Sequence, residues 1–374
     1  CRYKTLCGYR VERKAGWDTH GLPVELSVEK DLRIKKDDIG KKISISEYNE
    51  ACKKTVMQYT ESWNQLTQVM GYWVDVESPY ITYKNKYMET VWFLLKRLFD
   101  KNLIYKGYTI QPYSPAAGTG LSSHELNQPG CYKTVKDLSV FALFKVDDTS
   151  RLFSTTKNVF FAAWTTTPWT LFANTGLAVG KKINYSFIET LNPYTFEEIV
   201  VICAEDCINH LFDKKTKKII IEKRHSDCAY NVVHRCLGTD LVDLRYEQLL
   251  PYVQPLEMAE GAFRVINADF VNTSDGTGVV HLAPTFGADD FLVAKKEGLP
   301  MMLVLDEKNQ PVPVVDLLGR FVNGLGEFSG RYVKKGFGED GEDSVDVDIV
   351  VKLKKSGLAF RSEKYEHSYP HCWR

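Results

Sequence analysis

Three consecutive threonines, Thr165, Thr166 and Thr167, are the side chains of this sequence best suited to chemistry. They offer three hydroxyls and three backbone N–H groups within one short segment. The segment follows the run 158–163, whose apolar, aromatic and β-favouring residues predict a buried strand. Pro168 fixes its own φ and favours an extended backbone at the residue before it. The sequence therefore predicts polar groups at the mouth of an apolar sheet, where a small polar ligand can bind.

A second stretch, residues 276–290, has the same construction, because a short apolar strand again ends in polar groups. It contains His281 and, nine positions later, Asp290. Each candidate also has a plain structural interpretation. The threonines fit an edge strand, and a lone histidine is commonly a core side chain bonded to a backbone carbonyl. Asp290 fits the N-cap of a helix that starts near Phe291. The residues alone leave these alternatives open.

The two stretches resemble the threonine-rich peptide and the His-and-Asp peptide in the editing domain of isoleucyl-tRNA synthetases, the class I enzymes that join isoleucine to its tRNA. Two further matches to this family are residues 16–25, Gly-Trp-Asp-Thr-His-Gly-Leu-Pro-Val-Glu, and residues 369–374, Tyr-Pro-His-Cys-Trp-Arg. Valyl and leucyl relatives typically carry Arg at the position of Thr167, and valyl relatives have a different run after Gly-Trp-Asp. Both differences favour the isoleucyl branch.

The resemblance implies a role for each candidate. Asp290, and not its neighbour Asp289, would hold the α-amino group of a misattached amino acid, since a carboxylate suits an ammonium group. His281 would form part of the pocket wall and limit the size of the bound side chain. The three threonines would be catalytic, because they would bond the terminal adenosine and the ester and orient the attacking water.

Three more residues enter the site by resemblance, as substrate-binding residues. Trp164 and Asn174 would belong to the editing pocket, although Asn174 also suits a turn before Thr175. Asp18 would contact the α-amino group of isoleucine in the synthetic site, although it also suits a turn or a helix cap.

An editing site is needed because valine is isoleucine minus one methylene. A hydrophobic pocket gains only about 1–3 kcal/mol from that group, a limit for which the isoleucyl enzyme is the standard example. The resemblance thus implies hydrolysis of mischarged Val-tRNA(Ile), within an enzyme that forms Ile-tRNA(Ile) with ATP and magnesium. The alternatives are a tRNA acceptor-end binding module without chemistry, and a valyl or leucyl editing domain.

The chain is expected to be an internal piece of such an enzyme. It lacks an initiator methionine, the His-Ile-Gly-His motif and the Lys-Met-Ser-Lys-Ser motif. We therefore expect that it forms no aminoacyl-adenylate and holds no cofactor of its own.

The composition is that of an ordinary globular protein, with 44% hydrophobic and 26% charged residues. Lys+Arg and Asp+Glu both number 48, so the basic excess typical of nucleic-acid-binding proteins is missing. Any contact with the acceptor end of tRNA(Ile) would use local patches such as 214–218 and 352–355. No apolar run reaches the roughly 20 residues that span a bilayer, and the nine cysteines are scattered. We expect reduced thiols and a cytoplasmic monomer without membrane contact.

No zinc site is expected. Many bacterial relatives carry a Cys-x-x-Cys knuckle at residues 112–118 and a second one after the position of Pro370. Here Tyr113 and Ser114 stand in the first knuckle, and the second offers at most His371 and Cys372. Tetrahedral zinc needs four nitrogen or sulfur ligands.

Hydrophobic periodicity predicts the elements that position these residues. Helices are expected over 46–72, with Ser46 as the N-cap, and over 84–101, with helical patches at 204–212 and 289–297. Strands are expected over 139–145, 198–202, 218–221 and 263–266. Many short strands with turn signals suggest a closed or nearly closed barrel.

The predicted fold class is α+β, with a β-barrel-like editing domain and flanking helices inserted in an incomplete Rossmann-type catalytic core. Residues 1–45 would be a remnant of that core, and residues 46–136 a helical connective region. The editing domain would span 137–350, and residues 351–374 would return to the core. The acidic run 339–343 is expected to be a solvated loop.

Overall fold

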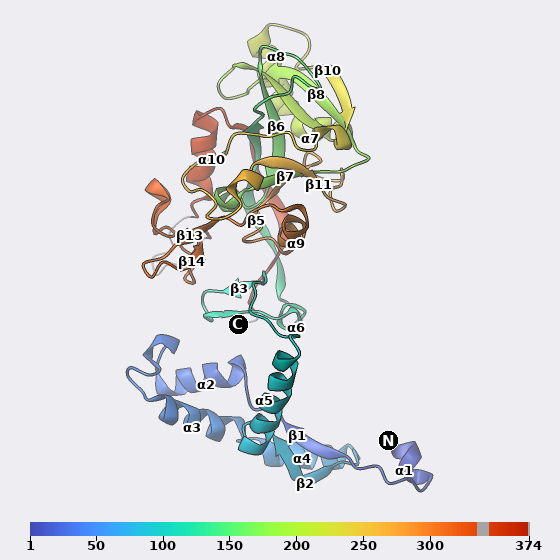
Figure 1. Cartoon of the computed structure of the whole chain (residues 1–374), viewed down its shortest axis with the longest axis vertical. Helices are drawn as coiled ribbons and strands as arrows, with labels where there is room; N and C mark the ends of the chain where they lie inside the picture. Colours follow the sequence, from blue (N-terminus) through green and yellow to red (C-terminus); the bar gives the residue numbers. More distant parts are fainter. Residues whose placement is uncertain (335–343, 373–374) are drawn as a thin grey trace. The chain divides into compact units, whose positions relative to one another are not determined.

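The computed structural model describes residues 1–334 and 344–372 (Figure 1). The acidic run 339–343 lies outside the described residues. The chain forms two compact units, residues 1–108 and 109–374. The predicted boundaries at 45, 136 and 350 are a finer division, which stays a prediction.

The first unit consists of helices and a two-stranded parallel sheet. Its elements are α1 (Arg2–Leu6), β1 (Lys14–Trp17), α2 (Leu22–Leu32), α3 (Ile45–Val56), α4 (Thr60–Val69), β2 (Asp75–Ile81) and α5 (Asn85–Asp100). The helix predicted over 84–101 is confirmed as α5.

The helix predicted over 46–72 is wrong in two respects. It is two helices, α3 and α4, and the N-cap of α3 is Ser44 in place of Ser46. Ser44 Oγ accepts a hydrogen bond from the N–H of Glu47 at 3.2 Å, and the Glu47 carboxylate accepts one from the N–H of Ser44 at 3.1 Å. This reciprocal capping box fixes the start of the helix two residues earlier than expected.

The second unit contains the remaining strands and helices. Its smaller elements are β3 (Tyr113–Ser114), β4 (Thr119–Gly120), α6 (Ser123–Leu126), β13 (Leu303–Leu305) and β14 (Pro311–Pro313). Its larger strands are β5 (Tyr132–Lys145), β6 (Asn158–Thr165), β7 (Gly176–Val179), β8 (Asn184–Leu191), β9 (Glu198–Ala204), β10 (Asn231–Leu237), β11 (Arg264–Asn267), β12 (Val279–Leu282) and β15 (Ala359–Pro370). Its helices are α7 (Ile208–Leu211), α8 (Lys214–Arg224), α9 (Ala288–Glu297), α10 (Asp346–Lys355) and the 3-10 helix η2 (Pro168–Ala173).

The larger strands form two open sheets. The larger sheet has the order β10-β8-β9-β6-β5-β15, and the smaller has the order β11-β7-β12. Neighbours are antiparallel except for the pairs β6–β9 and β11–β7. Within residues 1–334 and 344–372 no closed barrel forms, because β10 and β15 remain the two edges of the larger sheet. The predicted barrel is therefore corrected to a mixed α/β fold with open sheets.

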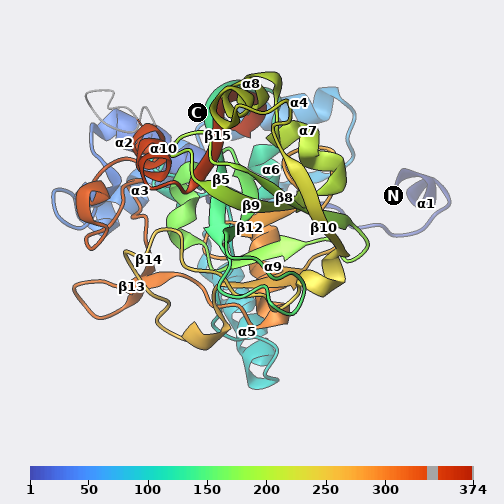
Figure 2. The same ribbon diagram turned by 90° about the horizontal axis from the view of Figure 1, so that it is seen from above.

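The larger sheet is covered on both faces, which explains the continuous apolar run of β6. Phe161 and Ala163 pack in one core with β7 and α10. Phe160 and Ala162 pack in a second core with α7 and α8, and both helices lie beside the sheet (Figure 2). The strand predicted over 158–163 is confirmed, and its last residue is Thr165.

Most other predicted elements of this unit are confirmed, but one is wrong. The strands over 139–145, 198–202 and 263–266 belong to β5, β9 and β11, and α9 covers the helical patch at 289–297. The run 218–221 was expected as a strand and lies inside helix α8. Helix α8 begins at Lys214, because the side chain of the preceding residue, Asp213, accepts a hydrogen bond from the N–H of Thr216 at 2.8 Å and caps the first turn.

Candidate functional site

The threonine-rich segment leaves the end of β6 and enters η2 directly. The N–H of Thr167 donates to Thr165 Oγ1 at 3.1 Å, and the two hydroxyl oxygens lie 3.3 Å apart. Thr167 Oγ1 also lies 3.2 Å from the hydroxyl oxygen of Thr170, which donates to the carbonyl of Thr167 at 2.8 Å. The hydroxyls of Thr165, Thr167 and Thr170 therefore form one connected row.

Thr166 differs from the other two predicted threonines. It is half-buried, and its hydroxyl forms no hydrogen bond to any residue in the described parts of the chain. This hydroxyl is therefore available to an incoming ligand.

The row of hydroxyls reaches the second predicted stretch. Thr170 Oγ1 lies 3.3 Å from Nε2 of His281. His281 belongs to β12, which pairs with β7 immediately after η2. The ring of Trp169 packs edge-to-face on Phe286, with ring centroids 4.9 Å apart. The structure thus brings together two stretches that lie more than 100 residues apart.

His281 is a neutral, buried side chain. Burial lowers its pKa to about 4, so the ring is uncharged at physiological pH. Its Nδ1 atom is buried and has no hydrogen-bond partner among the described residues. A polar atom without a partner in this position marks a place where a ligand or a water molecule would be stabilised.

Asp290 lies in the first turn of α9, where the helix dipole favours a negative charge. The N-cap is Gly287, so the alternative interpretation of Asp290 as the cap does not apply. Its Oδ2 atom accepts a hydrogen bond from the N–H of Ala283 at 2.9 Å. Burial raises the pKa of Asp290, and the charge of Asp289 adds to the rise, while the bond from Ala283 opposes it.

The side chain of Asp290 folds back against Gly287. A Cβ atom at position 287 would lie 2.5 Å from the carboxyl carbon of Asp290. Glycine at this position therefore leaves room for the carboxylate at the end of the second stretch.

Asn174 holds the two stretches together through its side-chain amide. It is almost fully buried. Its Nδ2 donates to the carbonyls of Gly176 at 2.9 Å and Leu282 at 3.4 Å. Its Oδ1 accepts from the hydroxyl of Tyr246 at 2.7 Å. Since these bonds use both ends of the amide, Asn174 fixes the junction between η2 and β12.

Trp164 lies on the other face of β6, because side chains alternate along a strand. It packs edge-to-face on Tyr365, with ring centroids 4.8 Å apart, and against the second core. It lines a hollow of about 250 Å³ together with Gly276, His210, Arg361 and other residues.

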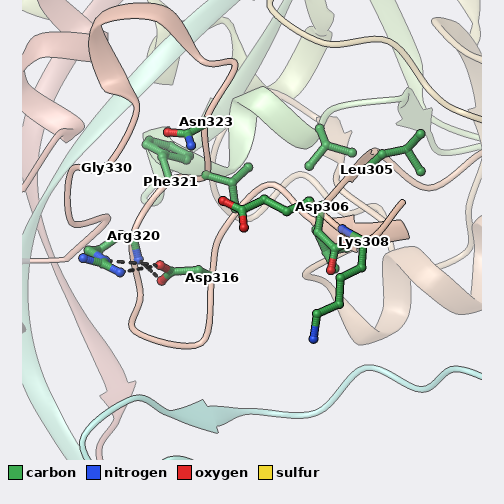
Figure 3. A pocket seen from close by; sticks show the side chains of 12 residues that line it. Leu305, Asp306, Lys308, Asp316, Arg320, Phe321, Asn323 and Gly330 are labelled. Carbon is green, nitrogen blue, oxygen red and sulfur yellow. Dashed lines mark hydrogen bonds and ion pairs between the residues drawn. The ribbon is translucent and has the colours of Figure 1, made fainter. Parts of the chain in front are cut away.

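A larger hollow of about 520 Å³ lies beside β13 and β14 (Figure 3). None of the predicted site residues lines the larger hollow.

Asp18 belongs to the first unit and is exposed after β1. Its neighbour Thr19 is anchored, because Thr19 N donates to the hydroxyl of Thr82 at 3.0 Å.

Two residues of the site were not predicted from the sequence. Thr170 connects Thr167 to His281, and its position three residues after Thr167 is a signal that could have revealed it. Asp346 accepts a hydrogen bond from the N–H of Trp169 at 3.0 Å. No local pattern marks Asp346, because its partner lies 177 residues earlier in the chain.

The described residues contain no group of three His, Cys, Asp or Glu side chains that could hold a metal ion. His371, one of the two remaining zinc-ligand candidates, directs Nδ1 towards the carbonyl of Tyr369 at 3.0 Å. In the same ranges, none of the helices combines the length and the apolar character needed to cross a membrane.

Comparison with known proteins identifies the family. The sequence model of the family described as tRNA synthetases class I (I, L, M and V) matches residues 1–304 of the chain. The chain belongs to this family of class I tRNA synthetases.

Its relatives include the isoleucine–tRNA ligase of Cytophaga hutchinsonii, which is 52% identical over the whole chain, and that of Bacteroides fragilis, which is 50% identical. The chain spans about a third of their length, 35% and 34% respectively. Among solved structures, the P. knowlesi cytosolic leucyl-tRNA synthetase editing domain matches 62% of the chain with 12% identity and a TM-score of 0.38.

Proposed function

We propose that this chain is the editing part of an isoleucine–tRNA ligase and that it hydrolyses valine from mischarged Val-tRNA(Ile). The observation that carries the proposal is the bonded path from Thr165 through Thr167 and Thr170 to His281. This path joins both polar stretches in one site. The identity of the relatives over the whole chain supports the isoleucine branch.

Asp290 is proposed to bind the α-ammonium group of the misattached amino acid. Burial alone disfavours its charged form. An ammonium group beside the carboxylate would lower the pKa of Asp290 again, so the charged pair would form together. The site would therefore bind the amino acid more weakly in acid, where Asp290 is protonated.

His281 is proposed to limit the size of the amino-acid side chain. Because it is buried and uncharged, its ring acts as a rigid wall and needs no counter-ion. Its link to Thr170 fixes the ring beside the row of hydroxyls. As a wall of the pocket, His281 would admit valine and exclude the additional methylene of isoleucine.

The threonines are proposed to orient the attacking water. Thr165 and Thr167 bond each other, which fixes the end of the strand, and the free hydroxyl of Thr166 would meet the ester or the terminal adenosine. Positioning of a water molecule and an ester accounts for large rate increases without a covalent intermediate. Trp164 offers an aromatic wall on the other face of the strand, where a base could stack.

The proposal extends to the complete enzyme. Its synthetic half would form Ile-tRNA(Ile) with ATP and magnesium, and Asp18 would contact isoleucine there. The editing domain, residues 137–350, would be inserted in a Rossmann-type core, of which residues 1–45 would be a remnant. The partner would be the acceptor end of tRNA(Ile), bound by a cytoplasmic monomer.

The test is deacylation of Val-tRNA(Ile) and Ile-tRNA(Ile) by the chain and by Asp290→Ala. We expect the chain to cleave the valyl ester and to spare the isoleucyl ester. Asp290→Ala is expected to lose the activity, whereas Asp289→Ala, at the exposed neighbouring carboxylate, is expected to keep it.

Two other outcomes are informative. If neither ester is cleaved but a valyl-adenosine analogue binds near Asp290 in a soaked crystal, the site is present and tRNA delivery needs the rest of the enzyme. If neither cleavage nor binding is seen, the assignment of both stretches to one pocket is wrong. Binding of tRNA without cleavage by wild-type protein, and without an effect of Thr166→Ala, would support a non-catalytic acceptor-end module instead.

A further inference from the structure

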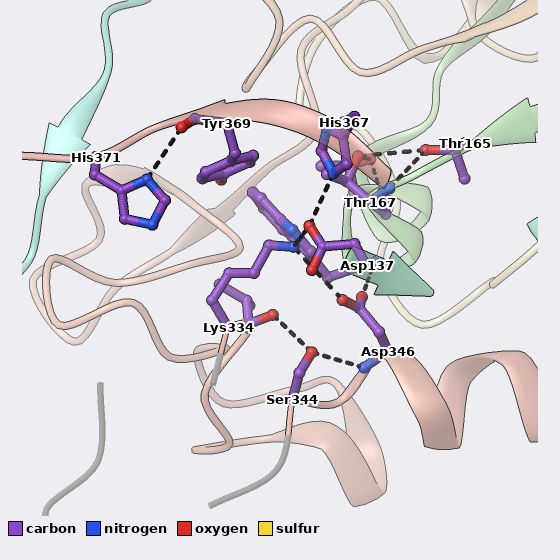
Figure 4. Close-up of polar contacts among 12 residues, drawn as sticks. Asp137, Thr165, Thr167, Lys334, Ser344, Asp346, His367, Tyr369 and His371 are labelled. Atoms are coloured by element: carbon purple, nitrogen blue, oxygen red, sulfur yellow. Dashed lines mark hydrogen bonds and ion pairs between the residues drawn. The ribbon is translucent and has the colours of Figure 1, made fainter. Parts of the chain in front are cut away.

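The carboxylate of Asp346 is buried at the start of α10 and lies against the threonine-rich segment. Only 4% of Asp346 is exposed. Its Oδ1 atom accepts a hydrogen bond from the N–H of Trp169 at 3.0 Å. Trp169 is the second residue of η2 and follows Thr167 by two positions. This bond therefore ties α10 to the segment that carries the hydroxyls (Figure 4).

We propose that Asp346 is a positioning residue, which holds the threonine-rich segment in the geometry that orients the attacking water. The proposal rests on the function proposed above, and Asp346 acts through Trp169 without touching the substrate. The N–H groups in the first turn of a helix lack partners within the helix. The carboxylate supplies the missing acceptor for Trp169, and its removal would leave that N–H unsatisfied in a largely buried place.

A cluster of charged side chains surrounds the carboxylate. Lys334 Nζ lies 4.0 Å from Asp346 Oδ2 and 2.8 Å from Asp137 Oδ2. His367 Nε2 lies 3.0 Å from the same oxygen of Asp137, and Lys334 also lies over the ring of Tyr369. The groups that face Asp346 thus come from β5, from β15 and from the segment before α10 (Figure 4).

The backbone at Asp346 is fixed as well. Its N–H donates to Ser344 Oγ at 3.2 Å, and the Ser344 hydroxyl donates to the carbonyl of Val333 at 3.1 Å. The carboxylate is therefore held from two sides, by its own backbone and by the cluster. A rigid acceptor of this kind can define the position of the turn that it bonds.

The ionisation of Asp346 adds a pH dependence. Burial raises the pKa of its carboxyl to about 6 and the charge of Asp137 adds to this rise, while Lys334, Ser344 and Trp169 act in the opposite direction. Protonation below about pH 6 weakens the pairing with Lys334. It also replaces a charged acceptor by a neutral and weaker one for the N–H of Trp169. The segment is therefore held less firmly in acid.

The first experiment follows the backbone N–H of Trp169 by NMR in the 374-residue chain. Labelling with ¹⁵N-tryptophan limits the spectrum to the seven tryptophans, and Trp169→Phe assigns the signal. We expect its chemical shift to titrate with a midpoint near pH 6 in the wild type. In Asp346→Ala the signal should be displaced and independent of pH over this range.

The matched control is Asp348→Ala, at an exposed carboxylate of the same helix that pairs with Arg331. It is expected to leave the Trp169 signal and its titration in place. A Trp169 signal that is unchanged in Asp346→Ala would overturn the proposal.

The second experiment measures the deacylation of Val-tRNA(Ile). Asp346→Ala is expected to lower kcat by about tenfold or more, because the hydroxyls lose their alignment. KM should change by less than about threefold, because the groups that bind the substrate remain. Asp346→Asn keeps an acceptor oxygen for Trp169 and is expected to restore most of kcat. Equal losses in Asp346→Asn and Asp346→Ala would contradict the positioning role.

The two experiments separate this proposal from the proposed function. If the wild type cleaves neither ester but Trp169 responds to Asp346 as expected, the proposed function fails while the contact stands. If the wild type cleaves the valyl ester and Asp346→Ala does so at the same rate, the positioning role fails while the function stands.

Discussion

Residues 1–108 and 109–374 both contain helices and strands, but they differ sharply in how their apolar side chains are packed. In residues 1–108, all of which the structure describes, the buried hydrophobic residues are Leu26, Val28 and Tyr48. In the second unit, large side chains such as Phe172 and Phe187 are fully buried. The second unit therefore has extensive apolar cores, and the first has only the beginning of one.

Helix α5 shows the difference most clearly. Its sequence predicts a buried side formed by Val91, Leu94, Leu95 and Leu98, but all four are exposed in the structure. Trp92 on the same helix is 64% exposed. A helix that is apolar on most of its surface normally lies inside a larger protein, and an exposed apolar patch of this kind marks a surface for another protein segment.

The comparison teaches that a core needs a second layer. The six-stranded sheet of the second unit is covered on one face by β7 and α10 and on the other by α7 and α8. The two-stranded sheet of the first unit has no comparable cover among the described residues. Similar apolar helices and strands therefore yield different degrees of burial in the two units.

The largest expected effect is on independent folding. The fragment 109–374 is expected to unfold in one cooperative transition, because it contains the three apolar clusters that the described residues form. The fragment 1–108 should show no cooperative transition and should bind a dye such as ANS. Circular dichroism on heating and ANS fluorescence measure both properties. Cooperative unfolding of both fragments would remove the distinction.

The next effect is a pair of matched substitutions in the two units. Phe172 is fully buried and packs against Tyr252, Phe321 and Phe328. Phe172→Ala is expected to lower the free energy of unfolding by about 3–5 kcal/mol. Phe93→Ala, at a residue that is 57% exposed, should change it by no more than about 0.5 kcal/mol. Urea denaturation of the whole chain measures both, and similar losses would show that α5 is buried in solution.

The sequence predicted the strands of the second unit well where burial leaves a simple pattern. The continuous apolar run of β6 follows from its position between two cores. The run 218–221 failed because its branched residues suggested a strand, while Asp213 three residues before Thr216 marks a helix start that outweighs them. The open edges of the sheet could not be predicted, since strand order depends on contacts between distant segments.

Some residues of the candidate site could likewise be predicted from the sequence, and others could not. The threonines, His281 and Asp290 could be selected from residue types that suit a polar ligand, and Thr170 could have been found by its spacing. Asp346 could not, because its role depends on one hydrogen bond to a residue 177 positions away. Two further tertiary features that no local pattern encodes are therefore the exposure of apolar side chains in the first unit and the support of the threonine-rich segment by Asp346.

A smaller effect concerns the pH dependence of the second unit. Burial lowers the pKa of His281 to about 4, below its ordinary value of 6.5. Its neutral form therefore contributes stability that is complete above pH 6.5 and is lost as the pH falls through 4, about 3 kcal/mol in all. Asp346 acts with the opposite sign, because its pKa is raised to about 6 and its contribution is lost as the pH rises. His281→Gln should therefore reduce the loss of stability on acidification.

Urea denaturation at a series of pH values between 7.5 and 4 tests this expectation, with the difference between variant and wild type as the quantity of interest. His210→Gln, at an exposed histidine, is the control and should follow the wild type at each pH. A parallel decline of His281→Gln and the wild type would show that His281 is not buried in solution.

The smallest effect compares one N-cap in each unit. The Asp213 side chain caps α8 through the N–H of Thr216 at 2.8 Å, and Ser44 Oγ caps α3 through the N–H of Glu47 at 3.2 Å. Loss of either cap costs the local helix about 1 kcal/mol.

Asp213→Ala should lower the stability of the second unit by about this amount, because Ile220 of α8 is part of the second core. Ser44→Ala should leave that transition unchanged, since α3 contributes nothing to it, and should reduce only the helical signal of the fragment 1–108. If Ser44→Ala shifted the main transition as much as Asp213→Ala, the two units would unfold together, and the local cost of a cap would be transmitted between them.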